Sequence, residues 1–178
     1  MDLLDLFDRG SKWTMSKVSG AKTDLDDPTP CEQWKVRDVM NHMLDSQRYF
    51  KDSAKGKDAA LPRGDTPPDK LAKDPVKQYD RARKATLDAF RVNGVLEKTG
   101  PALGIAFADQ LVHGWDLAKA TGQDTTMPDD LAQAAFQMVD GNIPDDRRGD
   151  DSFKPAIQVG DGSSVQQKLL AYLGREPN

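Results

Sequence analysis

Apolar residues recur every three or four positions along most of this sequence, a spacing typical of helices with one buried face. Segments rich in proline and glycine interrupt the pattern, because proline cannot continue a helix and glycine commonly ends one. Gly10 and Gly20 are expected to be weak points within the first helix. The pattern predicts helices over residues 1–22, 36–53, 75–93, 103–120, 131–141 and 165–173.

We therefore expect an all-α fold, in which the first four helices form a four-helix bundle and additional short C-terminal helices pack outside it. The chain has 178 residues, a length that suits one domain with one core. We predict a single domain over residues 1–178, with the core bundle in about 1–142. An irregular segment and the last helix are expected in 143–178, with a short extended piece at 156–159.

Charge and composition argue against several classes of function. The net charge is −4 and the isoelectric point is near 5.2, without a basic stripe, so a surface for nucleic acid or anionic membranes is not expected. No apolar run approaches the roughly 18 residues of a membrane span. A single cysteine permits no internal disulfide, and acids at positions 2 and 5 are unlike a signal peptide. We expect a cytoplasmic monomer or homodimer.

The two histidines of the chain both lie in predicted helices, beside carboxylates. Asp109 and His113 are four residues apart, so they share one helix face and could reach one ion. His42 lies at the edge of the apolar stripe of the second predicted helix. Two histidines and a carboxylate from two helices are the smallest set for an open metal site, so these three are the candidate ligands. Asp116, on the same side as His113, could orient that ring through its other nitrogen.

A simpler interpretation of each histidine stays open at this point. His42 could be a residue at the edge of the core whose ring is satisfied by Asp38 or Asp45. His113 could likewise donate to one of its own flanking acids without any metal. Spacing alone does not decide between these interpretations.

Other distinctive side chains are assigned more ordinary roles. Cys31 has no second cysteine and no histidine near it in the sequence, which favours a buried structural thiol over a nucleophile. Trp34 and Trp115 are expected in the core or in the wall of a pocket. Arg37 either binds a substrate carboxylate or pairs with an acid. The Asp- and Arg-rich residues 145–151 form either a solvated loop or a lid over a pocket.

Two blocks of the sequence resemble a known family. Residues 29–42 read TPCEQWKVRDVMNH, which is similar to the T-P-C-x-x-W-x-V-R-D-h-h-N-H block of actinobacterial proteins related to mycothiol-dependent maleylpyruvate isomerase. Residues 109–122 read DQLVHGWDLAKATG and resemble the second block of that family. The final LGREP also resembles the L-G-R-x-P ending of this subgroup.

This resemblance implies a DinB-like four-helix bundle that holds a divalent metal, usually zinc. It places the metal on His42, Asp109 and His113, and implies mycothiol, a low-molecular-weight thiol, as the cosubstrate. The leading hypothesis is a metal-dependent thiol S-transferase or isomerase that acts on a small electrophilic substrate. The sequence carries no Ser-His-Asp set, phosphate-binding loop or redox cysteine pair that would indicate another chemistry.

Two alternatives belong to different classes. On the first, the bundle is a non-catalytic protein that binds or sequesters a small molecule on the same metal-binding residues. On the second, it is a structural protein whose site is vestigial. Turnover of a thiol would separate the enzyme from both.

Overall fold

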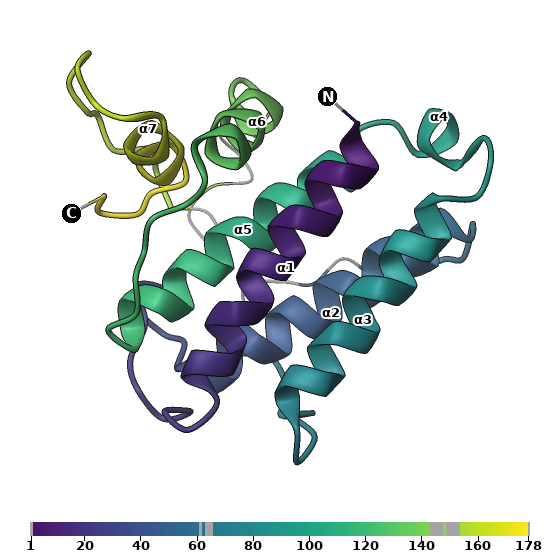
Figure 1. The fold of residues 1–178 in the computed structure, drawn as a ribbon, viewed down its shortest axis with the longest axis horizontal. Helices are drawn as coiled ribbons and strands as arrows, with labels where there is room; N and C mark the ends of the chain where they lie inside the picture. The colour runs from purple at the N-terminus through teal and green to yellow at the C-terminus, as the bar shows by residue number, and fades with distance from the viewer. Residues whose placement is uncertain (1, 61, 63–65, 143–147, 149–153, 178) are drawn as a thin grey trace.

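The computed structural model describes residues 2–60, 62, 66–142, 148 and 154–177. In these residues every regular element is a helix, which confirms the predicted all-α fold (Figure 1). None of the helices described is both long and apolar enough to cross a lipid bilayer. The helices are α1 (Leu3–Ala21), α2 (Val36–Ala54), α3 (Pro75–Phe90), α4 (Val95–Thr99), α5 (Ala102–Ala120), α6 (Asp129–Val139) and α7 (Val165–Tyr172).

Several helices begin at residues whose side chains satisfy the free backbone N–H groups of the first turn. The Asp2 carboxylate accepts a hydrogen bond from the Leu4 N–H at the start of α1. Asp74 accepts from Lys77 and is followed by proline at the first position of α3. These signals explain why the helix starts expected from the sequence lie close to the observed ones.

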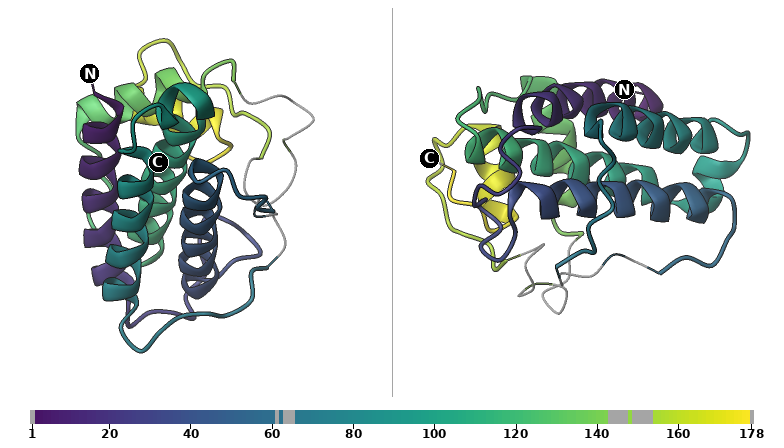
Figure 2. Two further views of the ribbon diagram at one scale, coloured as in Figure 1. Left: turned by 90° about the vertical axis from the view of Figure 1, so that its right-hand side faces the viewer. Right: turned by 90° about the horizontal axis from the view of Figure 1, so that it is seen from below.

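Helices α1, α2, α3 and α5 run side by side as a four-helix bundle (Figure 2). In this bundle α1 packs against α5 and α3, and α2 packs against α3 and α5. Outside it, α6 packs against α5 and α7 packs against α6 (Figure 1). This arrangement places the two histidine-bearing helices, α2 and α5, next to each other inside the bundle.

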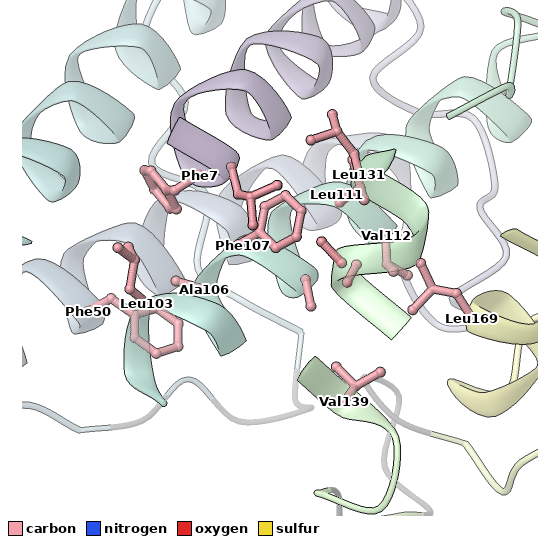
Figure 3. Packing of buried hydrophobic residues seen from close by; sticks show 14 of the residues in the cluster. Phe7, Phe50, Leu103, Ala106, Phe107, Leu111, Val112, Leu131, Val139 and Leu169 are labelled. Atoms are coloured by element: carbon pink, nitrogen blue, oxygen red, sulfur yellow. The ribbon is translucent and has the colours of Figure 1, made fainter. Parts of the chain in front are cut away.

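Buried apolar side chains form two clusters. The larger one, the main core, joins the bundle to α6 and α7 through residues such as Phe7, Phe107, Leu111 and Leu169 (Figure 3). The smaller one, the second cluster, includes Val18, Trp34, Met43, Tyr79 and Leu117. Trp34 of this second cluster packs against the candidate metal site.

The N-terminal helix is continuous through both of the glycines expected to weaken it. Gly10 is instead a point of close approach: a Cβ there would lie 2.6 Å from the Phe107 ring of α5. Gly114 has the same role on the facing helix, since its Cβ would meet the Thr14 hydroxyl at 2.8 Å and the Trp13 ring at 2.9 Å. The glycines therefore allow α1 and α5 to pack closely.

Other details differ from expectation or lie outside the described residues. The sequence pattern did not predict α4, which lies between Gly94 at φ +80° and Gly100 at φ +56°. Residues 156–159 have no regular structure, and the Ile157 N–H donates to the Ala171 carbonyl. The 145–151 run lies outside the described residues except for Arg148, whose guanidinium donates to the Tyr172 carbonyl.

We expect Gly114→Ala to lower the free energy of unfolding by about 1–3 kcal/mol, because the new methyl group clashes with α1 across a tight contact. Gly104→Ala in the same helix is the control. Its Cβ would meet only the flexible Met138 side chain, at 3.0 Å, so the gain in helix propensity of about 1 kcal/mol should offset the crowding. Urea denaturation measures both values. Equal effects of the two substitutions would contradict this account of the α1–α5 contact.

Candidate metal centre

The packing of α2 against α5 brings His42, Asp109 and His113 together. The two imidazole rings meet edge to face, with their centroids 4.8 Å apart. Oδ1 of Asp109 lies 3.4 Å from Nε2 of His42 and 3.5 Å from Nε2 of His113. The ligand atoms of the three residues all lie within 4.8 Å of one another. The candidate ligands predicted from the sequence are therefore neighbours in the structure.

The spacing of these atoms suits a shared cation as well as a hydrogen bond. The 3.4 Å contact of His42 with Asp109 is a long hydrogen bond, and the contact of His113 with Asp109 is longer still at 3.5 Å. Nitrogen and oxygen ligands at about 2.0–2.1 Å from a tetrahedral ion are themselves about 3.3–3.4 Å apart. The residues present thus fit a zinc-like ion with three protein ligands.

Burial and charge favour the protonation states that a metal requires. The side chains of His42, Asp109 and His113 are 5%, 10% and 4% exposed. Burial by itself would raise the pKa of Asp109, but the hydrogen bond with His42 and the charges of both histidines bring the pKa to about 2. Burial lowers the pKa of His113 from its ordinary value, and Asp116 opposes this shift only in part. A carboxylate and a neutral imidazole are the forms that bind metal.

Asp116 lies where it can fix the orientation of His113. Its Oδ2 lies 2.9 Å from Nδ1 of His113, so an Nδ1–H donor leaves Nε2 free to face Asp109. The Asp116 carboxylate is fully buried. Burial would raise the pKa of Asp116, but the Arg175 guanidinium and the His113 hydrogen bond hold it well below its ordinary value.

Cys31 belongs to a second group of candidate ligand atoms, with His113 and Asp116. No histidine is close to Cys31 in the sequence, but His113 is close to it in space, because the loop before α2 folds back against α5. This group already contains a cation: Nη2 of Arg175 lies 3.4 Å from the Cys31 sulfur and 3.0 Å from Asp116 Oδ2. The pKa of the Cys31 thiol is also raised strongly, first by burial and then by Asp116. A thiol in this state does not favour metal binding.

Comparison with known proteins places the chain in one family. Residues 14–118, more than half of the chain, match the family described as the mycothiol maleylpyruvate isomerase N-terminal domain. The chain belongs to this family. All three candidate ligands of this family member lie within the match, whereas Arg175 lies outside it.

The relatives of this family member include two proteins of Mycobacterium tuberculosis, the uncharacterized proteins MT0763 and Rv0738. Each is 28% identical over 144 residues, which cover 74% of this chain and 74% of the relative. No solved structure matches the chain significantly.

The two alternative partners of His42 have other roles in the structure. Asp38 accepts a hydrogen bond from the Lys35 backbone N–H at the start of α2, at 2.9 Å. Asp45 pairs with Lys70 at 2.8 Å. The carboxylate that His42 contacts is instead Asp109, at 3.4 Å.

The three residues predicted to line a pocket lie in different places. The Trp34 ring packs on His42, with centroids 4.8 Å apart, and is buried. Trp115 belongs to the main core. It lies two residues after His113, about 200° further around the helix, so the two side chains lie on different sides of α5. Arg37 pairs with Asp26 and Asp69 on the surface. Of the three, only Trp34 contacts the site.

Sequence reasoning missed two features of this site. The first is Arg175, whose only signal was the L-G-R-x-P ending. The second is Gln110, whose side-chain amide donates to Asp109 Oδ2 at 3.0 Å. The side-chain oxygen Oε1 of Gln110 is buried without a hydrogen-bond partner among the described residues, as are both side-chain amide atoms of Gln47 in α2. Such groups are usually satisfied by water or a polar ligand.

Cys31 should not react with an aromatic disulfide reagent at pH 8 in the native protein, because its thiol is buried and its pKa is raised. Unfolding in denaturant should expose one reactive thiol per chain. The measurement is the absorbance of the released thiolate with and without denaturant. Rapid reaction in the native state would contradict the buried position of Cys31.

The metal-free protein should lose stability as the pH falls below about 6.5, the ordinary pKa of histidine. The pKa of His113 is lowered in the folded state, so below that pH the unfolded chain binds a proton that the folded chain does not. The chain has only two histidines, so His113→Gln should weaken the dependence of stability on pH between about 5 and 7. The stability at each pH is measured by thermal unfolding followed by circular dichroism. An unchanged profile in the variant would contradict the burial of a neutral His113.

Proposed function

We propose that this protein is a metal-dependent enzyme that uses mycothiol as its cosubstrate, either a thiol S-transferase or an isomerase. On this proposal His42, Asp109 and His113 hold a divalent cation, which we assign as zinc. The observation that carries the proposal is the convergence of these three ligand atoms within 4.8 Å, in the family to which the chain belongs.

The donor set favours zinc over harder cations. Two imidazole nitrogens and one carboxylate are a usual catalytic set for zinc, whereas calcium and magnesium prefer oxygen ligands. Bound zinc with three protein ligands would leave one position for a thiol and would lower the pKa of that thiol, so that its proton would pass to solvent at neutral pH.

The protein side chains then position the reaction and exclude water from it. Asp116 holds the His113 ring, Trp34 packs against the His42 ring, and the burial of both rings keeps bulk water away. In a transfer, the thiol sulfur would form a bond to an electrophilic carbon while the bond from that carbon to its leaving group breaks, and the leaving group would take the electron pair. In an isomerisation, the sulfur would add to one carbon of a conjugated double bond, the π electron pair would move to the far end of the conjugated system, and that pair would return as the sulfur leaves.

A non-catalytic binding protein is the second candidate, and the burial of all three ligand side chains favours it. A site closed in this way suits a tightly held ion or small molecule as well as it suits turnover. The two candidates differ in one respect that can be measured directly, the consumption of thiol.

We expect His113→Ala to remove bound metal and turnover together, because two protein ligands hold zinc far more weakly than three. Asp116→Asn should lower metal affinity or activity about 10–100-fold, as is usual for a residue that orients a ligand. Cys31→Ser is the matched control and should stay close to wild type, since the nucleophile comes from the cosubstrate. The measurements are metal content after purification without chelator, and loss of free thiol with mycothiol and a panel of electrophiles.

Equal thiol consumption by wild type and His113→Ala would contradict the proposed chemistry. Wild-type protein that binds zinc but consumes no thiol across the panel would favour the binding protein instead.

A further inference from the structure

Helix α7 ends in a motif that turns the chain back toward the bundle. The Arg175 N–H donates to the Leu170 carbonyl at 2.9 Å, and the Gly174 N–H donates to the Ala171 carbonyl at 3.0 Å. This hydrogen-bond pair is a Schellman motif, which needs a left-handed residue after the last helical turn. Gly174 supplies it at φ +77°, and a Cβ there would lie 2.9 Å from the Lys154 backbone. The glycine therefore determines where the next side chain goes.

That next side chain, Arg175, enters the protein interior and is 5% exposed. Its Nη1 donates to the Leu173 carbonyl at 2.9 Å, which fixes the guanidinium relative to the end of α7. Its Nε and Nη2 reach the two oxygens of Asp116, at 3.4 and 3.0 Å. A forked contact of this kind sets the plane of the carboxylate as well as its position.

The same carboxylate oxygen connects Arg175 to the candidate ligand His113. Asp116 Oδ2 lies 3.0 Å from Arg175 Nη2 and 2.9 Å from His113 Nδ1. Asp116 is fully buried, so no solvent competes for its oxygens, and the charge of Arg175 compensates its own. Loss of the guanidinium would leave this carboxylate without two of its contacts and free to turn.

We propose that Arg175 is a positioning residue for the metal site: through Asp116 it holds the His113 ring with Nε2 facing Asp109. This inference rests on the proposed function, in which Nε2 of His113 binds the metal. It goes beyond the family match, which ends at residue 118 and so contains His113 and Asp116 but not Arg175. The helix cap at Gly174 thus directs Arg175 from the end of α7 to Asp116 in α5.

The test compares wild type with Arg175→Gln and Arg175→Lys. Zinc affinity is measured by competition with a chromophoric chelator, and we expect Arg175→Gln to bind about 10-fold more weakly, at the lower end of effects for residues behind a ligand. Arg175→Lys keeps the charge but not the fork, so it should restore part of the affinity. It also keeps the test usable if the glutamine variant does not fold.

The second readout is the orientation of the ring in metal-free protein, from two-bond hydrogen–nitrogen correlation spectra of the imidazoles. The chain has only two histidines, so their signals are readily separated. His113 of wild type should show a single tautomer, with a protonated Nδ1 and a bare Nε2. In Arg175→Gln, His113 should no longer show this tautomer alone. A merely structural arginine would not change this spectrum in a variant that is still folded.

The matched control is Arg83→Gln. Arg83 is 4% exposed and pairs with Asp8 and Asp80 at 3.0 and 2.7 Å, away from the ligands. Arg83→Gln should lower the stability of the protein and leave its zinc affinity and the His113 spectrum unchanged. Wild-type values for folded Arg175→Gln in both readouts, or equal changes in Arg83→Gln, would overturn the inference. Failure of the proposed function would look different, because the wild-type protein itself would not bind zinc. The spectra of metal-free protein would still show whether Arg175 fixes the His113 tautomer.

Discussion

The approach of two imidazole rings to one carboxylate, across the contact between α2 and α5, is the constraint on which the rest of this structure depends. His42 and His113 both turn Nε2 toward Asp109 Oδ1 in an interior that offers little water to either. The bundle also needs close packing on the other side of α5, where Gly114 allows α1 to approach. Trp34 of the second cluster packs against the His42 ring.

Buried charge is costly unless it is compensated, and here compensation extends in two directions from His113. On one side lies Asp109, with Gln110 donating to its second oxygen. On the other lies Asp116, with Arg175 and Cys31 around it. An apolar core would be the simpler means to stability, so this concentration of ionisable groups in a small helical domain favours a functional interpretation.

The sequence predicted the helices well because their apolar periodicity, proline starts and glycine ends are local signals. The Asp109–His113 pair was predictable for the same reason, since four residues on a helix fix the geometry. The approach of His42 required the packing of α2 on α5, and the family resemblance supplied that expectation. The short helix α4 was missed because five residues between two glycines carry no period.

Arg175 was missed for a different reason. It is 59 residues from Asp116 in the sequence, and only the path of the chain after α7 brings them together. Arg37 shows the opposite case: it lies near the first family block, yet its local acids Asp26 and Asp69 occupy it at the surface. Contacts made by long-range packing are the ones that a periodic pattern cannot supply.

The most direct test of the central claim is X-ray absorption at the zinc edge of the zinc-loaded protein, before and after addition of mycothiol. A site made by His42, Asp109 and His113 predicts only nitrogen and oxygen scatterers at about 2.0 Å in the protein alone. Addition of the thiol should then introduce one sulfur at about 2.3 Å. Sulfur in the first spectrum would place the ion on Cys31, and no sulfur in the second would contradict binding of the thiol at the metal.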